Sequence, residues 1–143
     1  MRTPRWISRK ALLLLHEESL AEFGGTRGMR DPGLLDSALA RPQNLRAYDP
    51  RSTIAELTAA YAYGIARNHP FVDGTKRAAF LSVGLFLAVN GYELCAGQVD
   101  AIQNMSGVAS GEVDEAALAA WVKSNSRRLG KSRSRVAQPL RIQ

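Results

Sequence analysis

The sequence predicts an all-α fold, a compact helical bundle with a buried central helix. Apolar residues recur at helical spacing in several windows, and capping residues and glycines bracket these windows. The strongest signal is the segment 78–89, in which ten of twelve residues are apolar on all sides, as is typical of a central helix. Strand-like alternation is confined to short pieces. With 143 residues, the chain is long enough for a single core.

A first helix is predicted over residues 8–23. Ser8 is a favourable N-cap, and Gly24-Gly25 ends the apolar pattern. His16 lies in this leucine-rich segment beside Glu17, and we interpret it as an ordinary structural residue. Four residues are expected on the inner face, namely Leu12, Leu15, Ser19 and Phe23.

A second helix should begin at Asp31-Pro32, where a capping carboxylate precedes a proline at the first helical position. Proline inside a helix removes a hydrogen bond and clashes with the preceding turn. We therefore expect this helix to end before Pro42. Residues 43–50 would then form an irregular connection.

The third and fourth helices are expected over residues 52–68 and 74–90. The apolar stripe of the third consists of Ile54, Leu57, Tyr61 and Ile65. The fourth should end at Asn90-Gly91. Gly84 lowers its helix propensity and is expected to let a neighbouring element approach closely.

Two weaker helices are predicted near 99–107 and 115–125, and Asp114 is placed to cap the second. The inner face of the last helix should consist of Leu118, Trp121 and Val122. From residue 124 onward, alternating serine and arginine are typical of a solvated segment. We therefore predict one helical domain at 1–126 and a basic, flexible tail at 127–143.

Most of the positive charge belongs to this tail. The net charge of +6 arises from 19 Lys and Arg against 13 Asp and Glu, and the tail holds six cations and no acid. Residues 1–126 therefore carry 13 basic and 13 acidic residues. Because residues 1–126 have no net charge, the domain is not expected to be a dedicated nucleic-acid binder. Nucleic acid should be contacted only indirectly through a partner protein, or weakly through the basic tail.

Other classes are excluded by composition. Cys95 is the only cysteine, which rules out an internal disulfide and a thiolate metal cluster. No apolar run is long enough to cross a bilayer, and residues 12–15 are too few for the core of a signal peptide. We expect a cytoplasmic location. No G-x-x-x-x-G-K-[ST] motif occurs, which argues against a P-loop enzyme.

The most informative segment is His69-Pro70-Phe71-Val72-Asp73-Gly74-Thr75-Lys76-Arg77, at the start of the buried fourth helix. A helix N-terminus has unpaired N–H groups and a partial positive charge, so it disfavours cations. Lys76 and Arg77 nevertheless occupy the first turn, and a bound anion would compensate their charge. Gly74 would let an oxygen approach, and the N–H groups of Gly74, Thr75 and Lys76 could cradle a phosphate.

Three further side chains in this segment have distinct chemistry. His69 can accept a proton near neutral pH and so act as a general base. Asp73 can bind Mg²⁺ beside nucleotide phosphates or cap the helix, and both roles stay open. Phe71 is expected to pack beneath the loop as an apolar anchor.

This segment resembles the signature of the Fic/Doc family, H-x-F-x-[DN]-[GA]-N-[KG]-R. Lys76 before Arg77 makes it most similar to the Doc branch, named for "death on curing". Residues 24–42, Asn90-Gly91-Tyr92-Glu93-Leu94 and the Trp121 helix are also similar to Doc proteins. The resemblance extends over about residues 8–125.

The resemblance implies a helical Fic/Doc fold and a toxin from a bacterial toxin–antitoxin pair. Fic relatives transfer AMP from ATP to protein hydroxyls. Doc relatives bind the nucleotide reversed and transfer the γ-phosphate of ATP to a threonine of elongation factor Tu, which halts translation. The implied cofactors are ATP as co-substrate and Mg²⁺, and the implied partner is a Phd-like antitoxin with an acidic segment that folds on binding.

The resemblance also implies a role for each residue of the segment. His69 would deprotonate the target hydroxyl, and Asp73 would hold Mg²⁺. Arg77 would clamp phosphate, and Arg67 would touch the nucleotide. The catalytic set is then His69, Lys76 and Arg77, and the anion cradle consists of Gly74, Thr75 and Lys76.

Thr75 stands where the family has asparagine. Threonine lacks the amide donor, and a lost charge-assisted hydrogen bond costs about 1.5–3 kcal/mol. The protein is therefore expected to be a weakened enzyme or one with an altered donor, and Thr75→Asn should raise its activity.

Two alternatives stay open. One is a Fic-type AMP-transferase, although Lys76 occupies a position where such enzymes usually have glycine. The other is a catalytically weak antitoxin-binding module, which Thr75 favours. An inhibitory motif of the form [ST]-x-x-x-E-[GN] is incomplete here, because Leu57 follows Ser52 and Glu56. Inhibition is therefore expected from a separate antitoxin.

Overall fold

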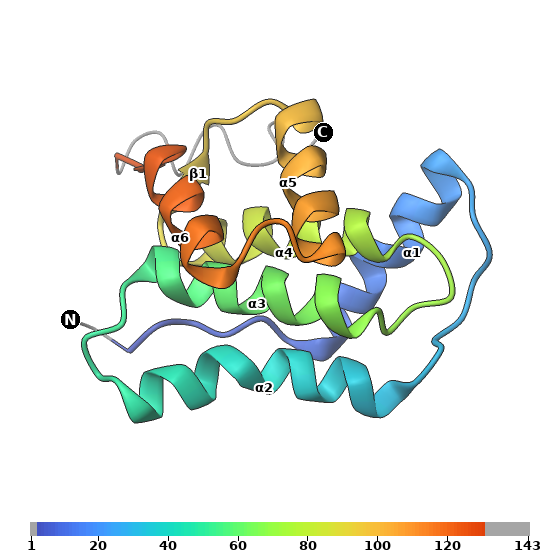
Figure 1. Ribbon diagram of the computed structural model, residues 1–143, viewed down its shortest axis with the longest axis horizontal. Coiled ribbons are helices and arrows are strands. Elements are labelled where there is room, and N and C mark those ends of the chain that lie inside the picture. Colours follow the sequence, from blue (N-terminus) through green and yellow to red (C-terminus); the bar gives the residue numbers. More distant parts are fainter. Residues whose placement is uncertain (1–2, 131–143) are drawn as a thin grey trace.

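The computed structural model describes residues 3–130, which form six helices and one small antiparallel sheet (Figure 1). The helices are α1 (Arg9–Phe23), α2 (Pro32–Tyr48), α3 (Ile54–Asn68), α4 (Thr75–Val89), α5 (Gln98–Ser110) and α6 (Glu115–Ser124). The strands are β1 (Tyr92–Leu94) and β2 (Ser126–Arg128). The all-α prediction is confirmed. No helix in this part of the chain is long and apolar enough to cross a membrane.

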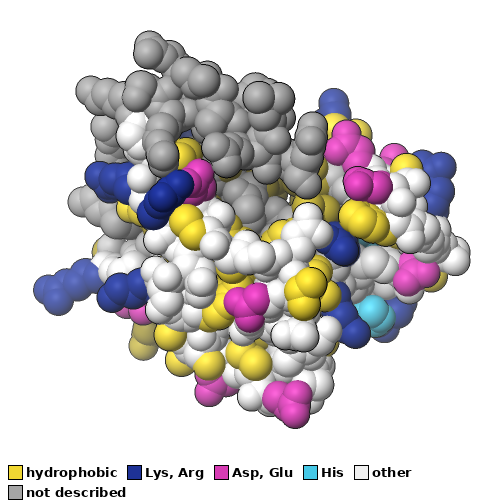
Figure 2. Space-filling view, turned by 90° about the horizontal axis from the view of Figure 1, so that it is seen from above, with side chains coloured by type: hydrophobic (Ala, Val, Ile, Leu, Met, Phe, Trp, Pro, Cys, Tyr) yellow, Lys and Arg dark blue, Asp and Glu magenta, His cyan; other side chains and the backbone are white. Residues whose placement is uncertain are grey.

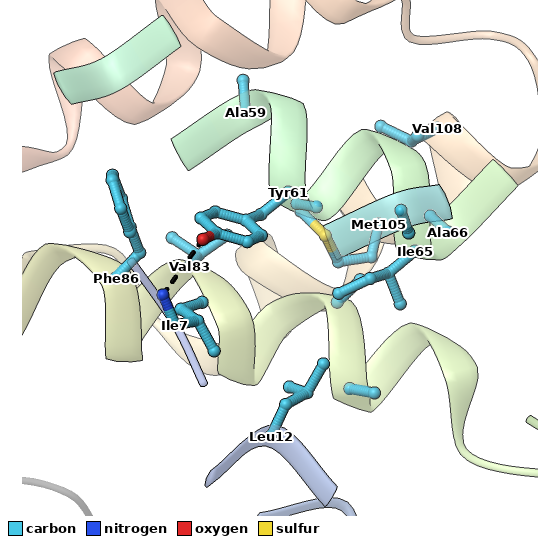
Figure 3. Packing of buried hydrophobic residues seen from close by; sticks show 14 of the residues in the cluster. Ile7, Leu12, Ala59, Tyr61, Ile65, Ala66, Val83, Phe86, Met105 and Val108 are labelled. Carbon is cyan, nitrogen blue, oxygen red and sulfur yellow. Dashed lines mark hydrogen bonds between the residues drawn. The ribbon is translucent and has the colours of Figure 1, made fainter. Parts of the chain in front are cut away.

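The centre of the bundle is formed by α3 and α4, which pack against each other. α3 also contacts α2, α5 and α6, whereas α1 packs on α4. The predicted stripe of α3 is buried at Leu57, Tyr61 and Ile65, and Ile54 is half-buried at the first turn. Figure 3 shows Tyr61 among the core side chains, with its hydroxyl accepting a hydrogen bond from the Ile7 N–H at 3.0 Å. The N-terminal segment is thereby attached to the core.

The predicted N-caps start three helices. The side chains of Ser8, Asp31 and Asp114 accept hydrogen bonds from backbone N–H groups of α1, α2 and α6. α3 begins slightly later than expected, because Thr53 and Glu56 form a reciprocal capping box there.

The predicted inner face of α1 is wrong in part. The buried residues are Leu12, His16, Ser19 and Leu20, so the inner face is rotated toward His16 and Leu20. Phe23 is 57% exposed because the last turn of α1 extends beyond the core. Its ring instead contacts the Arg77 guanidinium, with 4.3 Å between the ring centroid and Cζ.

The predicted end of α2 before Pro42 is also wrong. α2 continues through Pro42 to Tyr48, so residues 43–48 are helical. Leu35, Ala38 and Pro42 are buried at helical spacing, and Leu45 extends the same apolar face. Packing of this face on α3 offsets the helix-breaking cost of proline, about 3 kcal/mol in an exposed helix interior.

The expected close approach at Gly84 does not occur. A Cβ atom added at Gly84 would meet nothing within 4 Å. The close approach lies at Gly64 in α3, where an added Cβ would be 3.2 Å from the Cα of Ala38 in α2. Small residues therefore bring α2 and α3 together.

The folded domain extends beyond the predicted boundary at residue 126. Arg127 and Arg128 belong to β2, which pairs with β1 in the register Tyr92–Arg128, Glu93–Arg127 and Leu94–Ser126. Arg127 Nη2 lies 2.6 Å from Glu93 Oε2. Assigning these two arginines to the tail was therefore wrong, because their pairing partners are distant in sequence. The predicted tail residues 131–143 lie outside the described part of the chain.

Candidate active site

The candidate site is the connection between α3 and α4. His69 caps the C-terminus of α3, and its N–H donates to the Ile65 carbonyl at 3.0 Å. His69 has φ 52° and ψ 59°, and it is the only non-glycine residue with positive φ in the part of the chain that the structure describes. A left-handed conformation is costly for histidine, and such strain is often found at functional sites. Pro70 follows and prevents the helix from continuing.

The His69 side chain is available to a substrate. It is exposed, and within residues 3–130 no group forms a hydrogen bond or ion pair with its imidazole. Figure 2 shows a histidine side chain on the surface beside Lys and Arg side chains. An exposed imidazole without a partner can accept a proton from a hydroxyl group that docks there.

The connection is held by the α1–α2 segment that runs beside it. Met29 forms an isolated antiparallel bridge with Phe71. The Val72 N–H donates to the Gly28 carbonyl at 3.0 Å, and the Arg30 N–H donates to the Pro70 carbonyl at 2.7 Å. The Gly28–Arg30 segment therefore fixes the backbone between His69 and Asp73.

Arg30 also holds the end of α3 through its side chain. Its Nε and Nη2 atoms each donate at 2.8 Å, to the carbonyls of His69 and Asn68 respectively. A cation at a helix C-terminus is favourable because the last carbonyls lack helical partners. Sequence reasoning gave Arg30 no role, although it lies in the stretch 24–42 that resembles Doc proteins.

Phe71 is only 1% exposed and packs against His16 of α1. The two rings are stacked, with 3.7 Å between centroids and 16° between planes. His16 is 4% exposed, and its Nε2 atom lies 2.8 Å from the Asp73 carbonyl oxygen. His16 therefore lies directly beneath the connection, whereas it was predicted from the sequence to be an ordinary structural residue.

The Asp73 carboxylate is exposed and accepts two backbone hydrogen bonds. Oδ2 accepts from the Thr26 N–H at 3.1 Å, and Oδ1 accepts from the Gly74 N–H at 3.2 Å. Each carboxylate oxygen keeps a lone pair free. Within the described residues, no cluster of three or more His, Cys, Asp or Glu is present. One exposed carboxylate fits Mg²⁺ carried on nucleotide phosphates, which needs few protein ligands.

The start of α4 differs from the predicted cradle in two details. Gly74 has the left-handed conformation, with φ 76°, and its N–H is already bonded to Asp73. The N–H groups of Thr75, Lys76 and Arg77 remain without helical partners. Thr75 is 2% exposed, and its Oγ1 lies 3.4 Å from the Phe71 carbonyl oxygen, to which it donates. The threonine hydroxyl therefore points inward.

The three predicted cations differ in their surroundings. Lys76 is exposed. Arg77 is half-buried, with Cζ 4.3 Å and 5.8 Å from the ring centroids of Phe23 and Phe80, and its Nη1 lies 3.4 Å from Gln98 Oε1. Arg67 is exposed at the end of α3, with Nη1 3.4 Å from the Val108 carbonyl oxygen of α5. The Arg67 side chain thus lies against the last turn of α5.

A separate groove of about 700 Å³ lies between the end of α2, the start of α3, the length of α6 and the two strands. Its lining includes none of the predicted site residues. The candidate residues at the α3–α4 connection therefore lie outside this groove.

Comparisons with known proteins agree with this geometry. The model of the Fic/DOC family matches residues 6–87, from the segment before α1 to the last turn of α4. The chain is 38% identical over 90 residues to "Protein kinase doc" of Escherichia phage P1, covering 63% of this chain and 71% of that protein. It is 41% identical over 101 residues to "Toxin Doc" of Mycolicibacterium smegmatis, covering 68% and 78% respectively. The family match includes the whole α3–α4 connection, and the chain belongs to the Fic/Doc family.

Proposed function

We propose that this protein is the toxin of a toxin–antitoxin pair and a Doc-like kinase that transfers the γ-phosphate of ATP to a protein hydroxyl. The main support is the exposed, unpaired imidazole of His69, a few residues before a helix start that has free N–H groups and two cations. The names of the relatives, "Protein kinase doc" and "Toxin Doc", support the same activity.

The proposed reaction needs few groups. His69 removes the proton from the target hydroxyl, whose oxygen attacks the γ-phosphorus, and the bond from this phosphorus to the β–γ bridging oxygen breaks to release ADP. The N–H groups and cations at the start of α4 neutralise charge on the phosphates. Asp73 would hold Mg²⁺, which supplies further charge neutralisation. Because phosphoryl transfer depends mostly on positioning and charge, this set suffices.

The proposed target is a threonine of elongation factor Tu, so that phosphorylation stops translation in the cytoplasm. The support is the resemblance of the motif to the Doc branch, in which Lys76 precedes Arg77. A Phd-like antitoxin with an acidic segment is the proposed inhibitor.

The test is incubation of the purified protein with Mg²⁺, elongation factor Tu and ATP labelled at either the α- or the γ-phosphate. Label on the acceptor only from the γ position supports the kinase. Label from the α position would establish AMP transfer instead. His69→Ala should abolish the transfer while retaining the circular dichroism spectrum of the parent. Transfer at the parent rate would remove His69 from the mechanism.

A catalytically weak antitoxin-binding module is the second candidate. Two observations favour it. The Thr75 hydroxyl is directed inward to Phe71, and Arg77 is engaged with Phe23 and Gln98. No transfer from either label, together with growth arrest on expression that persists in His69→Ala, would support this candidate over the kinase.

A further inference from the structure

We infer that His16 is a positioning residue that orients the Asp73–Gly74 peptide and thereby the phosphate-binding start of α4. The inference rests on the proposed function for its consequence in catalysis. Its structural basis is the 2.8 Å contact from His16 Nε2 to the Asp73 carbonyl oxygen, made by a side chain that is 4% exposed.

The contact fixes where the histidine proton lies. A carbonyl oxygen can only accept a hydrogen bond, so Nε2 of His16 must be the donor. A buried carbonyl or imidazole N–H without a partner is costly, and therefore each group holds the other in place. Stacking on Phe71, with 3.7 Å between the rings, restricts the imidazole further.

The Asp73–Gly74 peptide is held at both ends. Its carbonyl accepts from His16, and its N–H donates to Asp73 Oδ1 at 3.2 Å. The other carboxylate oxygen of Asp73 is held by the Thr26 N–H. The orientation of this one peptide is therefore coupled to the direction of the carboxylate that would hold Mg²⁺.

Gly74 makes this restraint necessary. Its φ of 76° is in the left-handed region, and glycine adopts positive and negative φ about equally well. A flip of the preceding peptide would reverse the sign of φ at Gly74 at little local cost. It would also turn the carbonyl toward the side where the Gly74 N–H now faces the Asp73 carboxylate. The hydrogen bond from His16 selects the orientation that keeps this side free of a carbonyl.

The packing around Gly74 agrees with this role. A Cβ atom at Gly74 would lie 3.2 Å from His16 Nε2 and 3.2 Å from Leu20 Cδ2. α1 is thus in direct contact with the backbone of the connection, and His16 supplies the polar atom of that contact. A ring that served only to fill space would not need the N–H.

The variants His16→Gln and His16→Leu separate the hydrogen bond from the packing. Glutamine keeps an N–H donor at the same number of bonds from Cβ, whereas leucine fills similar space without a donor. Ser19→Ala changes another buried residue of the same helix face and is the control. We expect His16→Leu to lower kcat/KM for ATP about tenfold, as loss of one hydrogen bond predicts, and His16→Gln to restore most of it. Ser19→Ala should stay at the parent value.

A second measurement makes the inference independent of activity. In ¹⁵N spectra of the ligand-free protein, His16 should carry its proton on Nε2. Amide exchange at Gly74 should be faster in His16→Leu but near the parent rate in His16→Gln and Ser19→Ala. If the parent transfers no phosphate but the ¹⁵N and amide-exchange results are as expected, the proposed function fails and the inference about His16 stands. A proton on Nδ1, or equal exchange and equal kcat/KM in the parent and both His16 variants, would overturn the inference.

Discussion

At the scale of single residues, the backbone of His69 is held by Arg30, a side chain from another element. We expect Arg30→Met to lower the free energy of unfolding by about 1 kcal/mol, because the carbonyls of Asn68 and His69 lose a charged donor. The rate of the proposed transfer should also fall, since His69, the proposed base, would be less well positioned. Urea unfolding and the transfer assay measure the two effects.

Arg27→Met is a matched control for Arg30→Met. Arg27 lies in the same segment but pairs with Glu17 at 3.2 Å, with both side chains more than half exposed. Such surface pairs contribute little, so the change should be below about 0.5 kcal/mol. Equal effects of the two variants would contradict the role given to Arg30.

Thr75 is a second residue whose substitution is informative. We expect Thr75→Asn to raise the transfer rate about tenfold, because an amide donor becomes available for phosphate. Thr75→Val keeps the shape but loses the hydrogen bond to the Phe71 carbonyl. It should reduce stability by about 1 kcal/mol without raising the rate. A transfer rate in Thr75→Asn no higher than in the parent would contradict the expectation.

The site residues that are adjacent in the sequence could be predicted, but the distant residues that hold them in place could not. The motif residues from His69 to Arg77 are neighbours in the chain, so their common location follows directly. His16 and Arg30 reach the connection from α1 and from the α1–α2 segment, and their contacts cross 57 and 39 residues respectively. No local sequence pattern predicts such contacts. A histidine in a helix or an arginine in a loop is common in proteins, and its neighbours in the sequence do not indicate a distant partner.

At the scale of elements, local rules located every helix of the described chain and failed where tertiary packing opposes local propensity. The caps at Ser8, Asp31 and Asp114 depend on neighbouring residues alone, and they were predicted correctly. Pro42 was expected to end α2, but the apolar face of that helix continues through it. β2 has no strong strand pattern and forms because Glu93 and Tyr92 provide partners for its arginines.

Two glycines inside helices test the balance between local helix propensity and tertiary packing. We expect Gly84→Ala to raise the free energy of unfolding by about 0.5–1 kcal/mol, since nothing lies within 4 Å of an added Cβ. Gly64→Ala should lower it, because its Cβ would lie 2.7 Å from Arg41 Cδ and 3.2 Å from the Ala38 backbone. Thermal unfolding of both variants measures the difference, and a gain at Gly64 would contradict the packing of α2 on α3.

At the scale of the whole molecule, Tyr61 links the N-terminal segment to the centre of the bundle and makes stability depend on pH. Burial raises the pKa of Tyr61 above its usual value, although the hydrogen bond from Ile7 acts in the opposite direction. Above about pH 10, the unfolded chain releases this proton while the folded protein retains it. The folded state then binds more protons, so stability falls as pH rises.

The pH effect can be isolated by comparing the parent with Tyr61→Phe in urea between about pH 8 and 11. The parent should lose stability more steeply above pH 10, by up to about 1.4 kcal/mol per pH unit. At neutral pH the variant should be about 1 kcal/mol less stable, because the Ile7 N–H loses its acceptor. Parallel pH profiles would show that Tyr61 does not ionise on unfolding.

Under the proposed function, the left-handed backbone of His69 places the proposed base at a cost to folding stability. Glycine is the residue that a helix end of this geometry favours, and histidine there is tolerated at a conformational penalty. Under the proposed function, selection for thermal stability alone would favour His69→Gly, which would stabilise the fold but remove the proposed base. The proposed role of His69 as a base would then explain why histidine occupies this position despite its conformational cost.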